Sequence, residues 1–419
     1  MGSLPVHRAE ASSQASRWKY ALFGLFVLWG WRQRALDRPA AAPAIDAASK
    51  LDLDRPAAAP ATDAASKLDL VFTLDVTGSM GAYIDSAKEN IEAITERLVS
   101  RNGQRVDMRF GIVAYRDHPP QDETFVTKSF PFTRDVGQMR GALSELKASG
   151  GGDAPEAVGT ALGATLDCDW RKDATKVVIL IADAPPHGLS STGSDSFPNG
   201  EPTGTDPFEK LKSLAQLGAT IYSVVPGNDR AAIAFFGAAA KQTNGRAVAM
   251  KSAKYLADVV VGASLEEMDL EKLLPQIQEI TEEIRAADAS VSDEAVQSKV
   301  FERLSATKTR SRRTVIHSTL GDDDVVTGAT SLKEASAMYA ASAPPPSPPT
   351  LEMHGRKRSV HRMGAPAMAF AERSAAAFAV DAGVAADAAP EVELAHDEVV
   401  SEEAIRRAWN KGKALGKYD

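Results

Sequence analysis

A continuous apolar run at residues 176–183, KVVILIAD, constrains the fold more than any other feature of the sequence. A strand that is apolar on both faces must be covered on both, which is typical of the centre of a parallel sheet between helices. Strand-like and helix-like patterns alternate around this run from residue 68 to residue 263. Such alternation implies right-handed crossover connections. It predicts an α/β fold with a doubly wound, mostly parallel sheet.

Six strands are expected, with helices between them. Apolar stretches predict strands at residues 68–75, 106–115, 125–132, 176–183, 219–225 and 246–251. Apolar spacing, capping residues and turn residues predict helices near residues 80–98, 136–146, 153–166, 206–218 and 230–242. Pro131 confines the third strand to an edge or a strand end, because proline cannot donate to a sheet ladder.

The rest of the chain has a different composition. Residues 36–67 hold a tandem Pro/Ala-rich repeat, and proline-rich chain of this kind forms a semi-rigid spacer. An Ala/Ser/Pro-rich region near the C-terminus cannot bury enough apolar surface to fold alone. We therefore expect six segments: a leader at 1–35, a linker at 36–67, the α/β domain at 68–263, a helical extension at 264–305, a disordered tail at 306–398 and a short helix within 399–419 that presents Ile405 and Trp409.

The N-terminal segment allows several interpretations. Residues 18–31, WKYALFGLFVLWGW, are apolar and aromatic and are bordered by basic residues. This run is shorter than the about 20 residues of a spanning helix, and no small-residue cleavage site follows it. A helix lying in a membrane surface, a signal sequence and a disordered leader all remain open. We expect a cytoplasmic protein, with a membrane-associated or secretory location through residues 18–31 as the alternative.

Charge and cysteine content exclude some functions. The net charge of −8 argues against nucleic acid as the main partner. The single cysteine, Cys168, excludes an internal disulfide and fits a reducing compartment. Two basic clusters toward the C-terminus contain Thr314 and Ser359, which are candidate phosphorylation sites.

Acidic residues follow several of the predicted strands. Asp75, Asp117 and Asp183 stand at or just after strand ends, and Asp153 stands at a predicted helix start. Ligands of open α/β sheets bind outside the carboxyl ends of the strands, so these side chains are expected at one edge. Hard oxygen donors of this kind suit Mg²⁺, Mn²⁺ or Ca²⁺.

Four ordered motifs carry a family resemblance: DVTGSM at 75–80, AYRDH at 114–118, GGGDAPEAV at 150–158 and ADAPPHG at 182–188. The first resembles the DxSxS signature of von Willebrand factor type A domains. Together they are similar to the A domains of hemicentin and those associated with α-kinases. The resemblance covers about half of the chain.

The resemblance implies a metal-ion-dependent adhesion site (MIDAS). It assigns Asp75, Thr77 and Ser79 as ligands from the first loop and Asp183 from the third loop. Asp153 falls where most A domains have a metal-binding threonine. Three carboxylates would more than neutralise one divalent cation, which reduces the demand for an acidic residue from a partner. Mg²⁺ is the expected cation, with Mn²⁺ or Ca²⁺ as alternatives.

Simpler roles compete at several of these positions. Ser79 is also a plausible helix cap, and Asp153 with Glu156 matches a capping box. Asp117 is a candidate ion-pair partner of Arg116, and His187 is expected to hydrogen-bond within its loop. If a cation binds, Asp117 and His187 would surround its ligands rather than hold it directly.

The sequence favours a protein-binding module, of the adhesion or scaffold kind, over an enzyme. No nucleophile–base pair and no cofactor fingerprint is present. The alternatives are a metal-assisted hydrolase or phosphotransfer enzyme with Asp117 or His187 as base, an accessory protein of an α-kinase, and a membrane-tethered scaffold.

Overall fold

The structure, a computed structural model, describes residues 66–102, 106–190, 194–318, 320, 324–342 and 392–418. The chain divides into two compact units, Met1–Arg55 and Pro56–Asp419, and every described residue belongs to the second. The predictions for the leader, the repeat and Ser359 lie outside the described residues.

Six strands form one sheet in the order β3-β2-β1-β4-β5-β6. They are β1 (Ser66–Asp75), β2 (Val106–Tyr115), β3 (Thr127–Thr133), β4 (Thr175–Ile181), β5 (Ala219–Pro226) and β6 (Ala247–Met250). Neighbouring strands are parallel except for β2 and β3. The antiparallel β3, which contains Pro131, lies at the edge, where one side of the strand needs no partner. The predicted six-stranded, mostly parallel sheet is confirmed.

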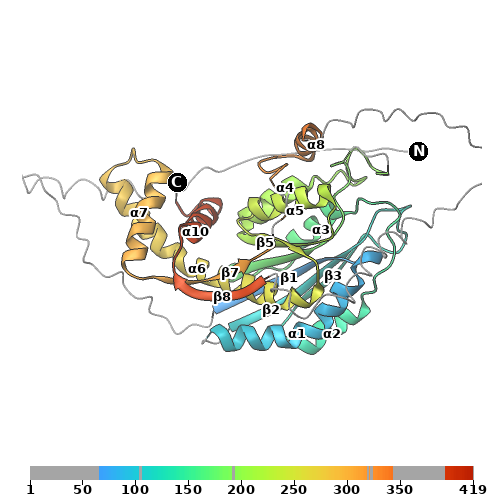
Figure 1. Ribbon diagram of the computed structural model, residues 1–419, viewed down its shortest axis with the longest axis horizontal. Helices are drawn as coiled ribbons and strands as arrows, with labels where there is room; N and C mark the ends of the chain where they lie inside the picture. Colours follow the sequence, from blue (N-terminus) through green and yellow to red (C-terminus); the bar gives the residue numbers. More distant parts are fainter. Residues whose placement is uncertain are drawn as a thin grey trace, which may run out of the picture. The chain divides into compact units, whose positions relative to one another are not determined.

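Helices cover both faces of this sheet (Figure 1). On one face lie α1 (Gly81–Asn102), α2 (Val136–Glu145) and α6 (Leu256–Ala287). On the other lie α3 (Val158–Leu166), α4 (Pro207–Leu217) and α5 (Arg230–Gln242). Every residue of β4 is buried between the two layers. The apolar run that predicts a central strand is therefore covered on both faces.

The helix expected from Asp153 begins later, at Val158. Residues 153–157 instead form a loop, because their backbone bonds to other loops. The Glu156 amide donates to the Pro185 carbonyl at 3.0 Å, and the Ala157 amide donates to the Arg116 carbonyl at 3.1 Å. These tertiary hydrogen bonds replace the local capping box, which is not formed.

The C-terminal region is more ordered than the sequence predicts. The predicted tail, 306–398, contains β7 (Arg310–Ile316), α8 (Leu332–Ala341) and most of β8 (Val392–Val399). β7 and β8 form a separate antiparallel pair. Strand pairing across such a long sequence separation leaves no local pattern, so composition alone misses it.

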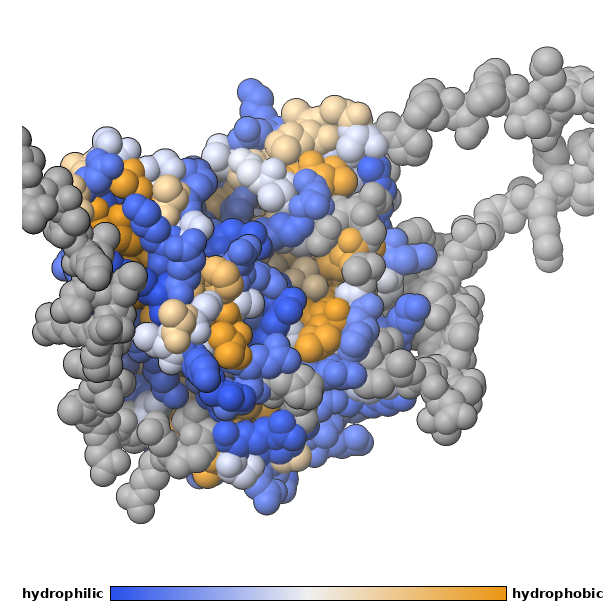
Figure 2. Space-filling view, turned by 60° about the vertical axis from the view of Figure 1, so that its left-hand side comes forward, coloured by the Kyte–Doolittle hydropathy of each residue, from blue (hydrophilic) through white to orange (hydrophobic). Residues whose placement is uncertain are grey.

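The last helix, α10 (Glu402–Ala414), packs against α6 and α7 (Asp293–Ala306). Ile405 and Trp409 are buried in this contact and are not presented to a partner. Arg407 forms buried ion pairs with Glu266 and Glu267 of α6. Figure 2 shows hydrophilic side chains over most of the side on which α7 and α10 lie, with hydrophobic ones in small separate patches.

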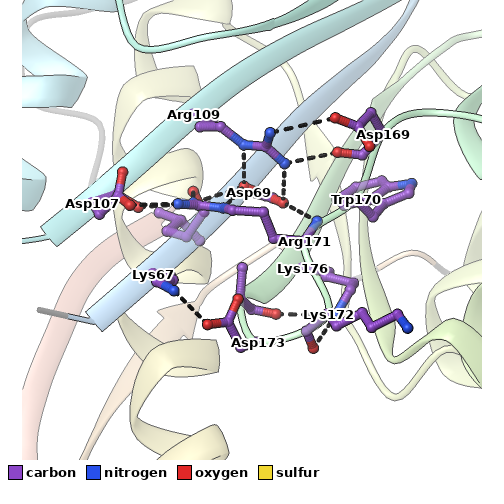
Figure 3. A network of polar contacts seen from close by, with 12 residues as sticks. Lys67, Asp69, Asp107, Arg109, Asp169, Trp170, Arg171, Lys172, Asp173 and Lys176 are labelled. Atoms are coloured by element: carbon purple, nitrogen blue, oxygen red, sulfur yellow. Dashed lines mark hydrogen bonds and ion pairs between the residues drawn. The ribbon is translucent and has the colours of Figure 1, made fainter. Parts of the chain in front are cut away.

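A charged network ties together the amino ends of the central strands (Figure 3). Asp69 of β1 is fully buried and accepts two hydrogen bonds from the Arg109 guanidinium, at 2.9 and 2.7 Å. The Arg171 amide and Nε donate to the same carboxylate at 2.8 and 2.9 Å. Arg171 also reaches Asp107 at 2.6 Å. Both oxygens of the buried Asp69 carboxylate are thus satisfied.

Among the helices of the described ranges, none combines the length and the apolar content that crossing a membrane requires. Residues 18–31 lie outside those ranges.

We expect Asp69→Asn to lower the free energy of unfolding by about 3–5 kcal/mol, because removing one partner leaves buried arginine charges uncompensated. The matched control is Asp173→Asn, which breaks an exposed pair with Lys67 at the same edge and should cost much less. Urea denaturation measures both. Equal effects of the two variants would contradict the structural role of Asp69.

The Asp69 contribution should depend on pH. Burial raises the pKa of Asp69, but hydrogen bonds from Arg109 and Arg171 outweigh burial and hold it below its usual value. A lowered folded-state pKa means that the unfolded chain binds the proton first as the pH falls. The stability difference between wild type and Asp69→Asn should be constant above about pH 5 and shrink below about pH 4.

Candidate functional site

The first loop of the candidate site follows β1. Asp75 is fully buried, and its Oδ1 accepts hydrogen bonds from the Thr77 amide at 2.8 Å and the Thr77 hydroxyl at 2.7 Å. Its Oδ2 is buried without a hydrogen-bond partner. Ser79 lies in a short 3₁₀ helix, Gly78–Met80, that leads into α1. Thr77 thus orients Asp75 and leaves one carboxylate oxygen available.

Asp183, just after β4, comes close to this loop. Burial raises the pKa of Asp183, against hydrogen bonds from the Ser79 side chain and from the backbone. Burial, and after it the charge of Asp183, raises the pKa of Asp75 to about 7, although Thr77 hydrogen bonds oppose the shift. The structure therefore brings together Asp75, Thr77, Ser79 and Asp183, four of the residues expected to hold a cation.

Glu156 is a further carboxylate at this point, for which the sequence predicts only a role in a helix cap. It is buried, and its Oε2 has no hydrogen-bond partner. Burial raises the pKa of Glu156 well above its usual value, and the charges of Asp75, Asp117, Asp183 and Asp153 raise it further. The charges of two neighbouring pairs of acids therefore act on Glu156.

A glycine loop before Glu156 allows this approach. Gly151 has φ +85°, and a Cβ there would lie 3.1 Å from Glu156 Oε1 and 3.4 Å from Thr77 Cβ. At Gly150, with φ +84°, a Cβ would collide with the Asp122 carboxylate. The left-handed backbone and the tight packing both require glycine here. The loop therefore runs close to the side chains of Thr77, Asp122 and Glu156.

Asp153 lies beside Asp117. Its Oδ2 accepts a hydrogen bond from the Ser196 amide at 2.6 Å, and its Oδ1 is buried without a partner. Burial raises the pKa of Asp153; the Ser196 hydrogen bonds oppose the shift, and contact with the Asp117 carboxyl adds to it. Among the described residues, Asp117, Asp153 and His187 form a group whose ligand atoms all lie within 4.8 Å of one another.

His187 is buried between two aspartates. Its Nε2 lies 2.6 Å from Asp117 Oδ1, and its Nδ1 lies 2.7 Å from Asp195 Oδ1. Burial lowers the pKa of His187, but the hydrogen bonds and charges of Asp117 and Asp195 outweigh burial and raise it to about 9. His187 is therefore a charged hydrogen-bond donor that connects the loops after β2 and β4.

Arg116 supports the neighbouring loops and does not pair with Asp117 as expected. Its guanidinium donates to the Lys147 carbonyl at 2.9 Å and to the Ser149 hydroxyl at 2.6 Å. Its ion pair, at 3.5 Å, is with Asp122. Arg116 therefore holds the glycine loop against the strand end.

The two candidate phosphorylation sites gain no support here. Thr314 is 1% exposed within β7, and its amide donates to Glu266 at 3.2 Å. A kinase would reach it only after β7 detached. Ser359 lies outside the described residues.

The carboxylates at this edge share one feature. Four of the acids each leave one buried oxygen without a hydrogen-bond partner: Asp75, Asp117, Asp153 and Glu156. The corresponding oxygen of Asp122 is paired with Arg116 at 3.5 Å. Buried anionic oxygens are costly when they are not paired with a charge or a donor. Carboxylate and hydroxyl oxygens are the donors that Mg²⁺, Mn²⁺ and Ca²⁺ prefer. The donor set therefore fits a hard divalent cation.

Two curated relatives match part of the chain. The alpha-protein kinase vwkA of Dictyostelium discoideum is 34% identical over 154 residues, 36% of this chain and 24% of its own. The ariadne-like RING finger protein R811 of Acanthamoeba polyphaga mimivirus is 30% identical over 189 residues, 44% of this chain and 18% of its own. This chain therefore matches less than a quarter of each relative's length.

The chain is also similar to a solved structure and to a protein family. The pilus adhesin SpaC of Lactobacillus rhamnosus GG aligns over 49% of this chain and 31% of its own, with 11% identity and a TM-score of 0.37, a likeness too low to carry an argument. The family of von Willebrand factor type A domains matches residues 70–185. This range contains the first three of the motifs that carry the resemblance and the first four residues of the fourth, ADAPPHG at 182–188. Together with the sheet order and the similarity to vwkA, this match shows that the chain contains a von Willebrand factor type A domain.

Proposed function

We propose that the domain is a protein-binding module whose surface depends on a divalent cation, Mg²⁺ in the first place. Asp75, Ser79 and Asp183 would hold the cation, with Thr77 and Glu156 completing the protein's oxygen donors. The partner is a protein, and the module serves adhesion or scaffolding. Domains of this family act as protein-interaction modules, which supports the coarser part of the proposal.

One observation carries the cation site. Asp75 Oδ2 and Glu156 Oε2 are buried oxygens without hydrogen-bond partners. The charge of Asp75 raises the pKa of Glu156, and the charge of Asp183 raises the pKa of both. Like charges in a buried position need protons or a cation between them. Thr77 fixes the other Asp75 oxygen, as ligating carboxylates are usually fixed by hydrogen bonds of their own.

In this proposal, Glu156 is a cation ligand in place of Asp153, which the family resemblance assigns to that position. Asp153 has Asp117 and Ser196 as neighbours, whereas Glu156 is coupled to both Asp75 and Asp183. The carboxylates of Asp75, Glu156 and Asp183 carry more negative charge than one divalent cation neutralises. The site therefore needs no acidic residue from its partner, and a neutral or basic contact suits it better.

The bound cation would neutralise the acids and fix three loops relative to one another. The loops at residues 75–80, 148–157 and 183–188 already touch through backbone hydrogen bonds. The Ser149 amide donates to the Val76 carbonyl, and the Glu156 amide donates to the Pro185 carbonyl. The loops present a surface on a rigid sheet, which is a suitable arrangement for binding.

The competing hydrolase function is less well supported. A general base must accept a proton near neutral pH. His187 has both ring nitrogens on carboxylates and a pKa raised to about 9, so it is already protonated. Asp117 is fully buried, and His187 binds one of its oxygens. Turnover of a generic phosphoester with Mg²⁺ or Mn²⁺ that is lost in Asp75→Asn would favour the enzyme.

An α-kinase is a candidate partner on one observation, the 34% identity to vwkA. The second relative is named for a RING finger and not for a kinase. Similarity to proteins with such different names is better explained by an interaction module than by either activity. Co-precipitation with a purified α-kinase catalytic domain, in Mg²⁺ and in EDTA, would test this partner.

We expect Mg²⁺ to raise the melting temperature of the wild-type protein, since a ligand at 100 times its dissociation constant stabilises by about 2.7 kcal/mol. Asp75→Asn and Glu156→Gln should each reduce this shift, because each removes a charged oxygen donor of the proposed site. In EDTA, Asp75→Asn should be more stable than wild type by on the order of 1–3 kcal/mol, because the amide removes a buried charge that Asp183 repels. Differential scanning fluorimetry measures both effects.

The control for this experiment is Asp173→Asn, whose side chain lies exposed at the opposite edge of the sheet. It should keep the full response to Mg²⁺. An equal response in Asp75→Asn, or no response of the wild type to Mg²⁺, Mn²⁺ or Ca²⁺, would rule out the proposed site.

Partner binding should follow the cation. In affinity capture, a set of proteins should be retained by the wild type and by Asp173→Asn in Mg²⁺, and lost in EDTA or with Asp75→Asn. Mass spectrometry of the retained proteins provides the measurement. Recovery of the same proteins under all four conditions would show that binding does not use this edge.

A further inference from the structure

A second pair of carboxylates lies next to the proposed site. Asp117 follows β2 and Asp153 lies in the loop before α3, and the two carboxyl groups are in contact. The Ser196 amide on the Asp153 carboxylate and the His187 ring on the Asp117 carboxylate hold them from the loop after β4. Residues from three separate loops therefore meet at this pair.

Each member of the pair uses one oxygen within the protein and leaves the other free. Asp117 is fully buried; its Oδ1 accepts from the His187 ring and from the His118 amide, both at 2.6 Å. Asp153 is half-buried, and its Oδ2 accepts from the Ser196 amide. Asp117 Oδ2 and Asp153 Oδ1 are buried and have no hydrogen-bond partner. Oriented carboxylates with a free oxygen are typical of metal ligands.

His187 orients the pair and is not itself available as a ligand. A ligating imidazole must present an unprotonated nitrogen. Both His187 nitrogens are bound to carboxylates, Asp117 on one side and Asp195 on the other. One ring can offset at most one of the three carboxylates around it, those of Asp117, Asp153 and Asp195.

We propose that Asp117 and Asp153 hold a second divalent cation beside the first, with Glu156 facing both. The ligand atoms are hard oxygens, so the cation is Ca²⁺, Mg²⁺ or Mn²⁺ and not zinc or copper. Asp153 is partly open to solvent, so water completes the coordination shell. This second cation would connect the loop at residues 194–200 to the loops that carry the first site.

The competing explanation is a proton shared between Asp117 and Asp153. Substitution by asparagine separates the two cases. An amide at position 153 keeps the shape of the side chain and donates a hydrogen bond to Asp117, as a protonated acid would. It removes the charge that a cation requires. Asp153→Asn is therefore expected to fold whichever explanation holds.

The test is the number of Mn²⁺ ions bound per full-length chain, measured by equilibrium dialysis with metal analysis and by calorimetry. We expect two ions for the wild type and one each for Asp153→Asn and Asp75→Asn. Electron paramagnetic resonance adds an independent measurement, because two neighbouring Mn²⁺ ions broaden each other's spectrum. Either single variant should restore the narrow spectrum of an isolated ion. Asp173→Asn should bind two ions like the wild type.

The possible outcomes separate this inference from the proposed function. One ion in the wild type, lost in Asp75→Asn and kept in Asp153→Asn, would overturn the second site and leave the first. One ion that is lost in Asp153→Asn and kept in Asp75→Asn would support the Asp117–Asp153 site and overturn the first. No bound ion would overturn both. Asp153→Ala provides a second variant without the amide hydrogen bond, and circular dichroism in EDTA confirms that each variant is folded.

Discussion

Repulsion between buried carboxylates at the carboxyl edge of the sheet is the constraint on which the functional part of this molecule depends. The register of β1 with β4, in which Leu74 lies opposite Ile181, forces Asp75 and Asp183 to emerge side by side. Glu156 reaches the same place because its backbone is bound to the loop after β4. The nearby Arg116 guanidinium donates hydrogen bonds to Thr124, Lys147 and Ser149. The charge of Arg116 lowers the pKa of Asp75, but burial and the charge of Asp183 outweigh it.

At the opposite edge of the sheet, the buried carboxylate of Asp69 is fully hydrogen-bonded within the protein. Asp69 is as deeply buried as Asp75, yet both of its oxygens accept hydrogen bonds from arginines, and its pKa is lowered. Asp75 has one oxygen bound by Thr77 and the other without a partner, and its pKa is raised. The same residue type on the same strand thus has opposite electrostatic surroundings at the two ends. Burial alone does not separate the two aspartates, whereas the hydrogen bonding of the second carboxylate oxygen does.

Local patterns predicted the sheet and the acids that follow directly from strands. The apolar run at residues 176–183 and the alternation around it are properties of short segments, and so are the positions of Asp75 and Asp183. The features that were missed depend on contacts between distant segments. β7 finds its partner in β8 across α8 and a long connection, and α10 buries Trp409 against its own domain. Asp195, which holds His187, lies in a loop whose sequence carries no periodic signal.

The pair Asp153 and Glu156 illustrates why spacing alone misleads at a functional site. In a capping box, the side chain of the first residue bonds the backbone amide three residues later, and the side chain there bonds the first backbone amide, so D-x-x-E is acceptable as a helix start. Here residues 153–157 form a loop, fixed by backbone hydrogen bonds to Pro185 and Arg116. The two acids consequently have different surroundings. Asp153 interacts with Asp117 and Ser196. Glu156 experiences the charges of Asp75 and Asp183 as well as those of Asp117 and Asp153. The sequence of residues 153–157 predicts a helix start, but in the fold these residues form a loop. The loop places Asp153 beside Asp117 and Glu156 within reach of the charges of Asp75 and Asp183. The tertiary hydrogen bonds that abolish the helical turn are therefore the same ones that create the site.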